Sequence, residues 1–538
     1  MVTETPDQER IKKLKADLCG TLQESNVHIN SLLQELENKN NADDAQVMPP
    51  TLLALQLELE DLENRANFVG IPNPQRCAVL ARRLGATVKI TDKTEVFQLD
   101  FAHDFPAHLN HCQLYFPSPK LTAQEIIDQL QQMEFEVIFV ISLVSIQQKA
   151  LHPHGEDPAN LWVIPNINEL TALLLSPEPI AVFIKLLSAQ LKISQISPYQ
   201  TTGAVQKDTI FFGRTQIIAQ IMNLAHTNYL LIGGRQLGKS SILKHIARRY
   251  QNNSWIICHY MVLSDHKLQP KLAKALNLPE NTDLSTLFAN LVNNGKRHLF
   301  LIDEADRFIR KEITEDYPIL RHFRALTGEE HCHFIFAGFW NLYEAVALDF
   351  QSPLRNFGEQ IHVGELETEA CQQLATEPMQ MLGINYDSED LVKQILEQTG
   401  QQANLIAIVC AKMLNKLGKG QRTLTQENVE QALQSRAVEE ALIGYGRLTD
   451  DKQAAGLDRI IVYLTVEKGN FTLMTLMDEL DKYHYTYTAD QLKESLTRLE
   501  LAFIICREGK SYRYCVPLFQ QMLIKQDLKA LLRAEGIK

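Results

Sequence analysis

The sequence lacks an apolar run long enough to cross a membrane, and it lacks an excess of positive charge. Its longest apolar stretch, VIFVISLVSI from Val137 to Ile146, is about half of the roughly 20 residues that a membrane-spanning helix needs. The formal net charge is -12, so any contact with nucleic acid has to come from a local basic patch. We therefore expect a protein that does not associate with membranes.

Regular cysteine spacing is also missing. Nine cysteines are scattered between Cys19 and Cys515, and no signal-peptide pattern precedes them. Two short Cys/His groups, Cys258–His259 and the HCH run from His331 to His333, have ligands too close in sequence for a usual zinc site. Both groups lie in expected strands. We expect reduced thiols and a cytoplasmic location.

The N-terminal third indicates architecture but no chemistry. Apolar residues at alternating three- and four-residue steps predict helices with a narrow seam in residues 1–70. Packing of this seam on the chain's own next domain is favoured over a coiled-coil contact between subunits. The seam residues are Ile11, Leu14, Leu18, Leu22, Leu52, Leu55, Leu59 and Leu62. In residues 71–195, β-rich runs alternate with helical ones, which indicates a small α/β domain with a largely parallel sheet. Its polar cluster of Asp100, His103 and Asp104 is interpreted as solvated loop residues.

The middle of the chain contains a phosphate-binding pattern. GGRQLGKSS, from Gly233 to Ser241, matches G-x-x-x-x-G-K-S in full, between the apolar run YLLI and the amphipathic run SILKHIARRY. Glycines allow backbone N–H groups to turn toward phosphates, and the following helix directs its positive end toward the same charge. Lys239 is expected to reach the β- and γ-phosphates, and Ser240 is expected to hold Mg²⁺. The predicted nucleotide-binding residues of this loop are Gly233, Gly234, Arg235, Gln236, Leu237, Gly238, Lys239, Ser240 and Ser241.

An acidic pair supplies the second element of such a site. In HLFLIDEADRFI, Asp303 and Glu304 follow an apolar run that predicts a buried strand. The end of this strand places Asp303 beside a metal ion and Glu304 where it can take a proton from an attacking water. Further strands are expected in SWIICHYMVLSD, HFIFAG and QIHVG.

Taken in order, five segments resemble the STAND signal-transduction NTPases and their AAA+ relatives akin to origin-recognition ATPases. They are FFGRTQII, GGRQLGKSS, LFLIDEAD, HFIFAGFWNLY and SPLRNFGEQIHVGELETEACQQLATEPMQMLGI, within Ile210 to Leu433. The resemblance implies ATP and Mg²⁺ as cofactors, and it places Gly213 and Arg214 near the base and ribose. It also implies that Arg355 reaches the γ-phosphate of a neighbouring subunit in a homo-oligomer. From the residues alone, Arg355 is a solvated or ion-paired loop arginine.

The chain departs from the family pattern in two places. Its fourth strand ends in AGFW without the polar side chain that orients water in AAA+ relatives, and Asn341 comes late, so hydrolysis is expected to be slow. In the lid, Gln402 and Ala403 stand where STAND proteins typically have His and Pro. In STAND proteins this turn provides a contact to the phosphate. The sequence therefore gives no basis for expecting that contact in this chain.

The last segment predicts a winged helix whose charge does not favour DNA. Beyond Asp458, three helical runs precede two β-rich runs joined through Gly509–Lys510, which is the order of a winged helix. DNA binding needs net positive charge at the phosphates, so these residues favour a protein contact or an intramolecular latch. The presumed recognition helix carries Lys493 and Arg498 against Asp490, Glu494 and Glu500, and the hairpin carries Arg507, Lys510 and Arg513.

The sequence therefore predicts a multidomain α/β protein built on the parallel sheet of a P-loop NTPase. The expected segments are N-terminal helices (1–70), a small α/β domain (71–195), a linker (196–209), the P-loop core (210–365), a helical lid (366–445) and a winged helix (450–538). The leading hypothesis is an ATP-binding, slowly hydrolysing regulatory switch with an unknown protein partner at its N-terminal domain. The alternative is an origin-recognition-like ATPase that grips duplex DNA.

Overall fold

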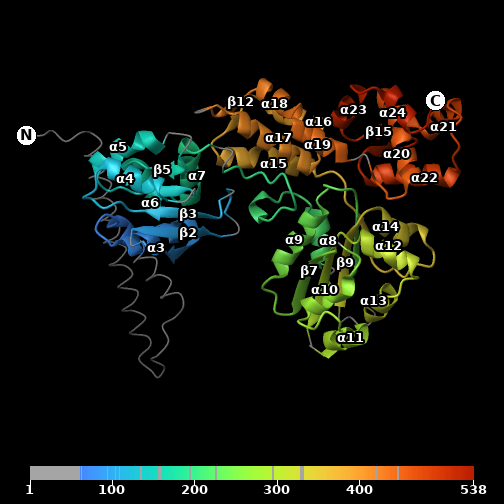
Figure 1. Ribbon diagram of the computed structural model, residues 1–538, viewed down its shortest axis with the longest axis horizontal. Coiled ribbons are helices and arrows are strands. Elements are labelled where there is room, and N and C mark those ends of the chain that lie inside the picture. Colours follow the sequence, from blue (N-terminus) through green and yellow to red (C-terminus); the bar gives the residue numbers. More distant parts are fainter. Residues whose placement is uncertain are drawn as a thin grey trace, which may run out of the picture. The chain divides into compact units, whose positions relative to one another are not determined.

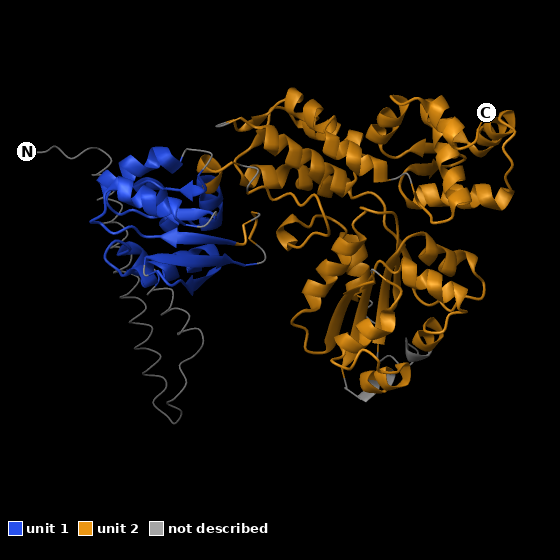
Figure 2. Cartoon of the chain, viewed as in Figure 1, with its two compact units in different colours: residues 1–102, 111–186 blue, residues 103–110, 187–538 orange. Residues whose placement is uncertain are grey.

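The structure is a computed structural model in which the chain forms two compact units, residues 1–102 with 111–186 and residues 103–110 with 187–538 (Figure 2). It describes residues 61–537 apart from 62, 94, 103–104, 108, 134–135, 156–159, 193–195, 224–226, 264, 294–295, 328–331, 419–420 and 445–446. The helical seam expected in residues 1–70 lies almost entirely outside the described residues. Among the helices that the structure does describe, none is long and apolar enough to span a bilayer.

The first unit contains a five-stranded sheet in the order β1-β2-β3-β4-β5 (Figure 1). The strands are β1 (Ala86–Ile90), β2 (Val96–Phe101), β3 (His111–Tyr115), β4 (Ile138–Val140) and β5 (Trp162–Val163). The last three strands are parallel, as predicted, but β1, β2 and β3 pair antiparallel. The expectation of a largely parallel sheet was therefore wrong for this half, because the connections between these strands are too short for the crossover that parallel pairing requires.

Helices cover this first sheet. They are α3 (Asn73–Leu84), α4 (Ala123–Gln131), α5 (Ser145–Gly155), α6 (Ile167–Leu175) and α7 (Pro179–Gln190). Asp100 lies inside β2 rather than in a loop, where its carboxylate accepts hydrogen bonds from Lys89 and Gln98, both at 2.5 Å. These bonds lower the pKa of Asp100. Its expected neighbours His103 and Asp104 lie outside the described residues.

The second unit is built on a parallel sheet in the order β10-β6-β9-β8-β7 (Figure 1). The strands are β6 (Tyr229–Ile232), β7 (Ile256–Val262), β8 (Arg297–Asp303), β9 (Cys332–Gly338) and β10 (Glu359–His362). All five were predicted from the sequence. Strands β6 and β9 are buried throughout, and β8 is buried from its second residue onward. Such strands read as continuous apolar runs because a parallel sheet is covered on both faces.

Helices from successive connections form the two covering layers of this sheet. One face packs against α8 (Thr215–Asn223) and α9 (Lys239–Tyr250). Residues of four helices pack on the other face: α10 (Leu268–Ala275), α11 (Leu284–Asn293), α12 (Asp306–Thr314) and α13 (Leu320–Thr327). A short helix, α14 (Trp340–Tyr343), follows β9 directly. This arrangement brings the carboxyl ends of β6, β8 and β9 to one edge of the sheet.

A helical lid and a C-terminal domain complete the second unit. The lid helices are α15 (Thr368–Met381), α16 (Glu389–Thr399), α17 (Ala403–Lys416), α18 (Gln426–Leu433) and α19 (Arg436–Ile443). The C-terminal elements are α20 (Lys452–Thr465), β13 (Asn470–Thr472), α21 (Leu473–Lys482), α22 (Ala489–Leu501), β14 (Ile505–Glu508), β15 (Ser511–Tyr514), α23 (Pro517–Ile524) and α24 (Leu528–Ala534). The predicted three helices and hairpin are present, and β13 adds a third antiparallel strand that the sequence did not reveal.

Two histidines on neighbouring strands of the core form a stacked pair. The rings of His259 on β7 and His298 on β8 lie 5.2 Å apart and within 1° of parallel, and Nε2 of His259 lies 3.0 Å from Nδ1 of His298. Phe300 stacks on His259 at 4.9 Å. Burial lowers the pKa of both rings, and it lowers that of His259 to about 4.

We expect this pair to make the core sensitive to acid. A folded pKa below the unfolded value of about 6.5 means that stability is present above pH 6.5 and is lost as the pH falls through about 4. The loss is on the order of 2 kcal/mol after allowance for partial exposure. His259→Phe, measured by denaturant unfolding at neutral and mildly acidic pH, should remove much of this dependence. A variant that keeps the wild-type pH dependence would show that other groups titrate.

Candidate nucleotide site

The glycine-rich loop joins β6 to α9 as the sequence predicted. Gly238 has φ 95° and precedes the first residue of α9, and Gln236 has φ 64°. Only glycine adopts the conformation of Gly238 without strain. Gly233 passes so close to β10 that a Cβ there would lie 2.6 Å from the carbonyl oxygen of Val363. The loop backbone is therefore held in the turn that directs N–H groups and the helix N-terminus toward one point.

Lys239, the first residue of α9, folds back over this loop. Its Nζ donates hydrogen bonds to the carbonyl oxygens of Gly233 at 2.7 Å and Gly234 at 2.6 Å. Burial lowers the pKa of Lys239, while the nearby carboxylates, foremost Asp306, raise it. Two of the three N–H groups of the ammonium thus fix its position. The third N–H can donate to an anion bound beside the loop.

The acidic pair lies at the end of β8, where the sequence placed it. Asp303 is buried, and its Oδ2 accepts a hydrogen bond from the Tyr260 hydroxyl at 2.9 Å. Glu304 is exposed, has φ 53°, and donates its backbone N–H to Oδ1 of Asp303 at 3.0 Å. A left-handed glutamate costs backbone energy and is typical of functional turns. Sequence reasoning missed Tyr260, because nothing in an apolar strand run marks which residue faces the neighbouring carboxylate.

A third acidic residue of the same segment was also missed. Asp306 begins α12, and its carboxylate accepts N–H hydrogen bonds from Phe339 at 2.7 Å, Asn341 at 3.0 Å and Leu342 at 3.3 Å. The Asn341 side chain donates to the Asp306 carbonyl at 3.3 Å. Asn341, the polar residue that follows the fourth core strand, β9, is therefore hydrogen-bonded to Asp306 through both its backbone and its side chain. The only sequence signal for this link was the position of Asp306 in DEAD.

Arg214, predicted near base and ribose, has a buried side chain with 7% exposure. Its guanidinium donates to the carbonyl oxygens of Glu365 at 2.7 Å, Gly364 at 2.6 Å and Leu237 at 3.2 Å. Gly213 has φ 69°, and a Cβ there would lie 2.6 Å from the Cβ of Ala370. The side chain of Arg214 thus joins the phosphate loop to the connection between core and lid. A contact of these two residues with base and ribose stays a prediction.

Arg355 lies in the loop before β10 and stacks on a neighbour in the same loop. Its guanidinium carbon is 3.9 Å from the centre of the Phe350 ring, and Phe350 is 78% exposed. A cation–π contact of this kind holds the guanidinium in a defined direction. Its contact with a neighbouring subunit stays a prediction.

The lid contacts the phosphate loop through a residue that the family pattern did not indicate. Asn404, in the first turn of α17, donates from Nδ2 to Oε1 of Gln236 at 3.1 Å. The preceding Gln401 has φ 56°, and its carbonyl accepts the N–H of Leu366 at 3.0 Å. Gln402 itself is buried. Lid and loop are thus connected although the His and Pro of the family turn are replaced.

Residues 196–211, here called the strap, pack on α9. The backbone N–H of Val205 donates to Oγ of Ser241 at 3.0 Å. Asp208 accepts hydrogen bonds from Nε and Nη2 of Arg248 at 2.8 and 2.5 Å, and it lies 2.9 Å from Nδ1 of His245. These contacts fix the strap against the helix that carries Lys239.

The C-terminal domain contacts the phosphate loop directly. The N–H of Gly234 donates to the carbonyl oxygen of Leu501, the last residue of α22, at 2.7 Å. A Cβ on Gly234 would lie 2.8 Å from the Cα of Ala502. Phe503, with φ 59°, packs against the core residues on the α9 face of the sheet. The turn after α22 therefore lies on the loop that the sequence assigns to phosphates.

The sequence placed two cations, Lys493 and Arg498, on the presumed recognition helix α22, and the structure shows that Arg498 is not available to bind DNA. The side chain is 2% exposed and donates to the Asp458 carboxylate from Nε at 3.0 Å and from Nη2 at 2.9 Å. Its guanidinium carbon lies 4.5 Å from the centre of the Trp340 ring. Arg498 cannot reach DNA because it is buried between α20 and α14. The sequence of a helix does not show which of its faces is covered by other elements of the fold.

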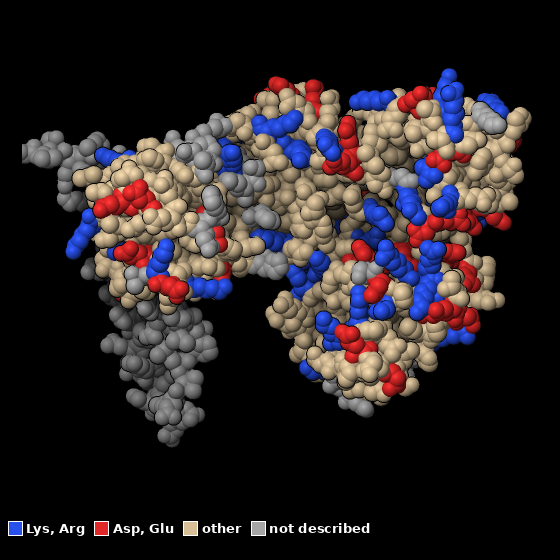
Figure 3. All heavy atoms as spheres, viewed as in Figure 1, with Lys and Arg blue, Asp and Glu red and all other residues tan. Residues whose placement is uncertain are grey.

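Two of the three basic residues of the hairpin, Arg507 and Arg513, are engaged locally. Arg513 forms an ion pair with Glu508, and Nε of Arg507 donates to the carbonyl oxygen of Gly509 at 3.1 Å. On the face of the molecule that Figure 3 shows, basic and acidic side chains are both present over the C-terminal part of the chain. The expected basic character of the hairpin is thus partly neutralised by its own acidic residue.

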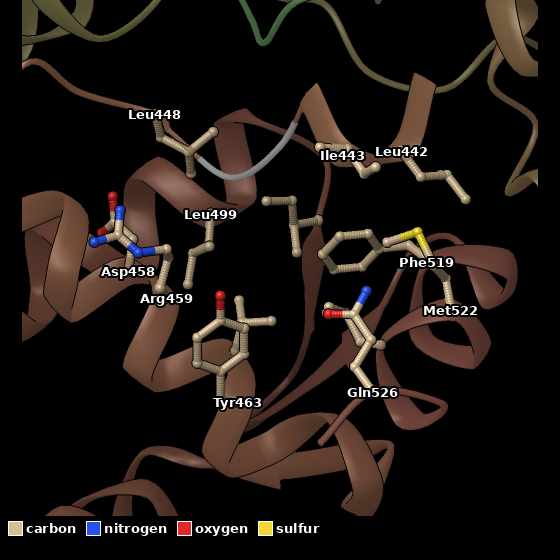
Figure 4. Close-up of a pocket in the computed structure, with 13 residues that line it drawn as sticks. Leu442, Ile443, Leu448, Asp458, Arg459, Tyr463, Leu499, Phe519, Met522 and Gln526 are labelled. Carbon is tan, nitrogen blue, oxygen red and sulfur yellow. The ribbon is translucent and has the colours of Figure 1, made fainter. Parts of the chain in front are cut away.

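A cavity of about 150 Å³ lies where the last lid helix meets the C-terminal domain (Figure 4). Leu442 and Ile443 of α19 face Val462 of α20 and Phe519 of α23 across a mostly apolar lining. Small-molecule pockets usually measure about 300 Å³ or more, so this space does not fit a nucleotide. It marks imperfect packing between the lid and the C-terminal domain.

The sheet order, the glycine loop with its lysine, and the acidic strand end define a P-loop NTPase. Residues 198–503 match the family model described as Novel STAND NTPase 1. This match covers more than half of the chain, and the chain belongs to that STAND family. The matched range begins in the strap and ends at Phe503.

Solved structures of low identity match part of the chain. The Walker-type ATPase PABY2304 of Pyrococcus abyssi is 15% identical, covering 61% of this chain and 99% of that chain, with a TM-score of 0.46. The ORC1 protein of Aeropyrum pernix in complex with DNA is 12% identical, covering 60% and 96%, with a TM-score of 0.34. The RuvB Holliday junction branch migration motor of Thermotoga maritima is 14% identical, covering 56% and 92%, with a TM-score of 0.31. No curated protein sequence matches the chain.

Proposed function

We propose that the chain is an ATP-binding regulatory switch in which the C-terminal domain acts as a latch on the phosphate loop. The N–H groups of residues 233–241, with Lys239, would hold the phosphates, and Ser240 with Asp303 would hold Mg²⁺. Bound Mg²⁺ would supply charge neutralisation at the phosphates. The left-handed Gly238, the close approach of Gly233 to β10 and the inward-facing ammonium fit this ligand.

Hydrolysis would be a slow step in this switch. Glu304 is exposed at the strand end beside Asp303, where it can accept a proton from water. The only polar side chain close after the fourth strand, Asn341, bonds to the Asp306 carbonyl. A water beside the γ-phosphate would therefore be oriented by fewer groups than in relatives with a polar residue at the end of that strand.

The observation that carries the proposal is the contact of Gly234 with Leu501 and Ala502. A ligand shifts an equilibrium only by binding one state better than the other. A nucleotide that draws the lid and loop together favours one arrangement of the loop, and the latch bonds to that same loop. Nucleotide binding and latch contact are thus coupled through Gly234. The buried Arg498 and the ion pair of Arg513 with Glu508 favour this function over a grip on duplex DNA.

Oligomerisation and signalling belong to the same proposal. Release of the latch would expose Trp340 of the core, which Arg498 now covers, and Phe503 of the latch, which now packs against the core. We propose that the open form then associates with further copies, with Arg355 at the γ-phosphate of the neighbouring subunit. The first unit would bind the protein partner that receives the signal.

Gly234→Ala should release the latch without nucleotide. Gly234 has no positive φ, so alanine suits its backbone, but the new Cβ would collide with Ala502 at 2.8 Å. Contacts at such distances do not occur without displacement, so the latch should shift. We expect faster cleavage of the segment between α19 and α20 by protease, and a larger hydrodynamic radius, in the absence of ATP.

Gly418→Ala is the matched control. Gly418 lies outside the segment between α19 and α20, it has no positive φ, and a Cβ there would meet only the Gln421 side chain at 3.7 Å, an ordinary contact distance. Phe503→Ala tests the same contact from the C-terminal domain, since it removes packing without changing the phosphate loop. If Gly234→Ala and Phe503→Ala both keep the protease pattern and radius of Gly418→Ala, the latch is not what restrains the chain.

A further inference from the structure

We propose that Asp306 is a positioning residue that links the phosphate site to the latch through α14. The proposal rests on the switch function above and adds the route by which the site acts on the C-terminal domain. Three contacts carry it: Asp306 with the N-terminus of α14, Trp340 with Arg498, and Arg498 with Asp458. All three join different elements of the second unit.

Asp306 holds the position of α14. Its two carboxylate oxygens accept the N–H groups of Phe339, the N-cap of α14, and of Asn341 and Leu342 in its first turn. These N–H groups belong to a helix start, where no backbone carbonyl within the helix can accept them. α14 continues directly into the π-helical turn Glu344–Leu348, so this carboxylate holds the start of a longer helical segment.

What packs on the far side of α14 is the latch. Trp340 is 7% exposed, and its ring lies beneath the Arg498 guanidinium at 4.5 Å and beside Tyr343 at 5.6 Å. Arg498 is fixed by Asp458 and by Oγ of Ser495, both buried. Since the guanidinium cannot move freely, a displacement of Trp340 has to weaken the stacking.

The phosphate site can supply that displacement. Of the carboxylates around Lys239, Asp306 has the largest effect in raising the pKa of that ammonium, and Asp306 is itself partly buried. A phosphate that binds Lys239 brings negative charge close to the Asp306 carboxylate, where low polarity makes repulsion strong. Asp306 would shift, α14 would shift with the three N–H groups bonded to it, and Trp340 would leave Arg498.

The test uses Trp340 as a reporter. The chain has three tryptophans, so Trp162→Phe with Trp255→Phe leaves Trp340 as the single emitter. We expect its emission to change on addition of ATP with Mg²⁺. In the same background, Asp306→Asn should bind the nucleotide analogue within a few-fold of the parent and show no emission change, because asparagine cannot accept all three N–H groups. Asp306→Glu should restore part of the change.

Asp316→Asn is the control, because Asp316 is an exposed carboxylate in the same core with φ 62°, which asparagine tolerates. If Asp306→Asn responds like this control, the positioning role is wrong and the switch stands. If nucleotide binds the parent without changing Trp340 emission or protease accessibility, the switch itself fails. Should Asp306→Asn not fold, Trp340→Leu decides: loss of the stacking should raise nucleotide affinity several-fold, and an unchanged affinity overturns the proposal.

Discussion

Replacing Lys239 with methionine is expected to lower the affinity of the chain for ATP about 100-fold. The partly buried ammonium is held by the carbonyl oxygens of Gly233 and Gly234, so its remaining N–H donor can bind a phosphate at little further cost in entropy. A charge-assisted hydrogen bond to a phosphate is worth about 3 kcal/mol, which corresponds to this loss. Calorimetric titration with a non-hydrolysable ATP analogue in the presence of Mg²⁺ measures it.

Lys244→Met is the matched control for this variant. It removes the same charge from the same helix, but Nζ of Lys244 lies over the Tyr260 ring at 5.9 Å instead of over the loop. We expect its affinity to stay within about threefold of the wild type, as for a partly exposed cation–π contact. Equal affinities of Lys239→Met and Lys244→Met would show that the loop does not hold the phosphates.

Arg498→Met is expected to destabilise the C-terminal domain by about 3 to 5 kcal/mol, because it leaves the buried Asp458 carboxylate without its partner. Burial raises the pKa of Asp458, and in the native chain the hydrogen bonds from Arg498 oppose that rise. Without Arg498 the folded pKa rises further above its unfolded value of about 3.9. Stability is then lost as the pH rises through the folded pKa, so the variant should be less destabilised under mildly acidic conditions than at neutral pH.

Scanning calorimetry of the C-terminal transition across this pH range checks the expectation. Lys493→Met removes a cation from an exposed position of the same helix and should change stability by less than about 0.5 kcal/mol. A second variant that also replaces Asp458 with leucine should recover most of the loss, since an apolar pair can substitute for a buried ion pair. Equal stability of Arg498→Met and Lys493→Met would contradict the buried ion pair.

The phosphate loop and the acidic strand end were predictable because each is a local pattern with one geometric solution. A glycine that must be left-handed, a lysine after it and flanking apolar and amphipathic runs define strand, loop and helix within twenty or so residues. Strands β6, β8 and β9 were predictable for a similar reason, since buried strands are continuous apolar runs. The antiparallel half of the first sheet was not, because pairing direction depends on connections whose turns the sequence marks only weakly.

Residues that act through distant partners could not be predicted. Tyr260 and Asp306 look like an ordinary strand tyrosine and a helix-start aspartate until the sheet order places them against Asp303 and α14. Arg498 was counted among the cations of the presumed recognition helix, yet its carboxylate partner Asp458 lies forty residues away in the sequence.

The sequence by itself determined the class of protein, the glycine-rich loop between a strand and a helix, and the acidic pair at a strand end, because each depends on neighbours a few positions apart. Only the tertiary structure decided that α22 lies on Gly234, that Arg214 joins the loop to the lid connection and that Asp306 holds α14. These contacts join residues separated by tens to hundreds of positions. Their geometry follows from how whole elements pack, and no local pattern of side chains records it.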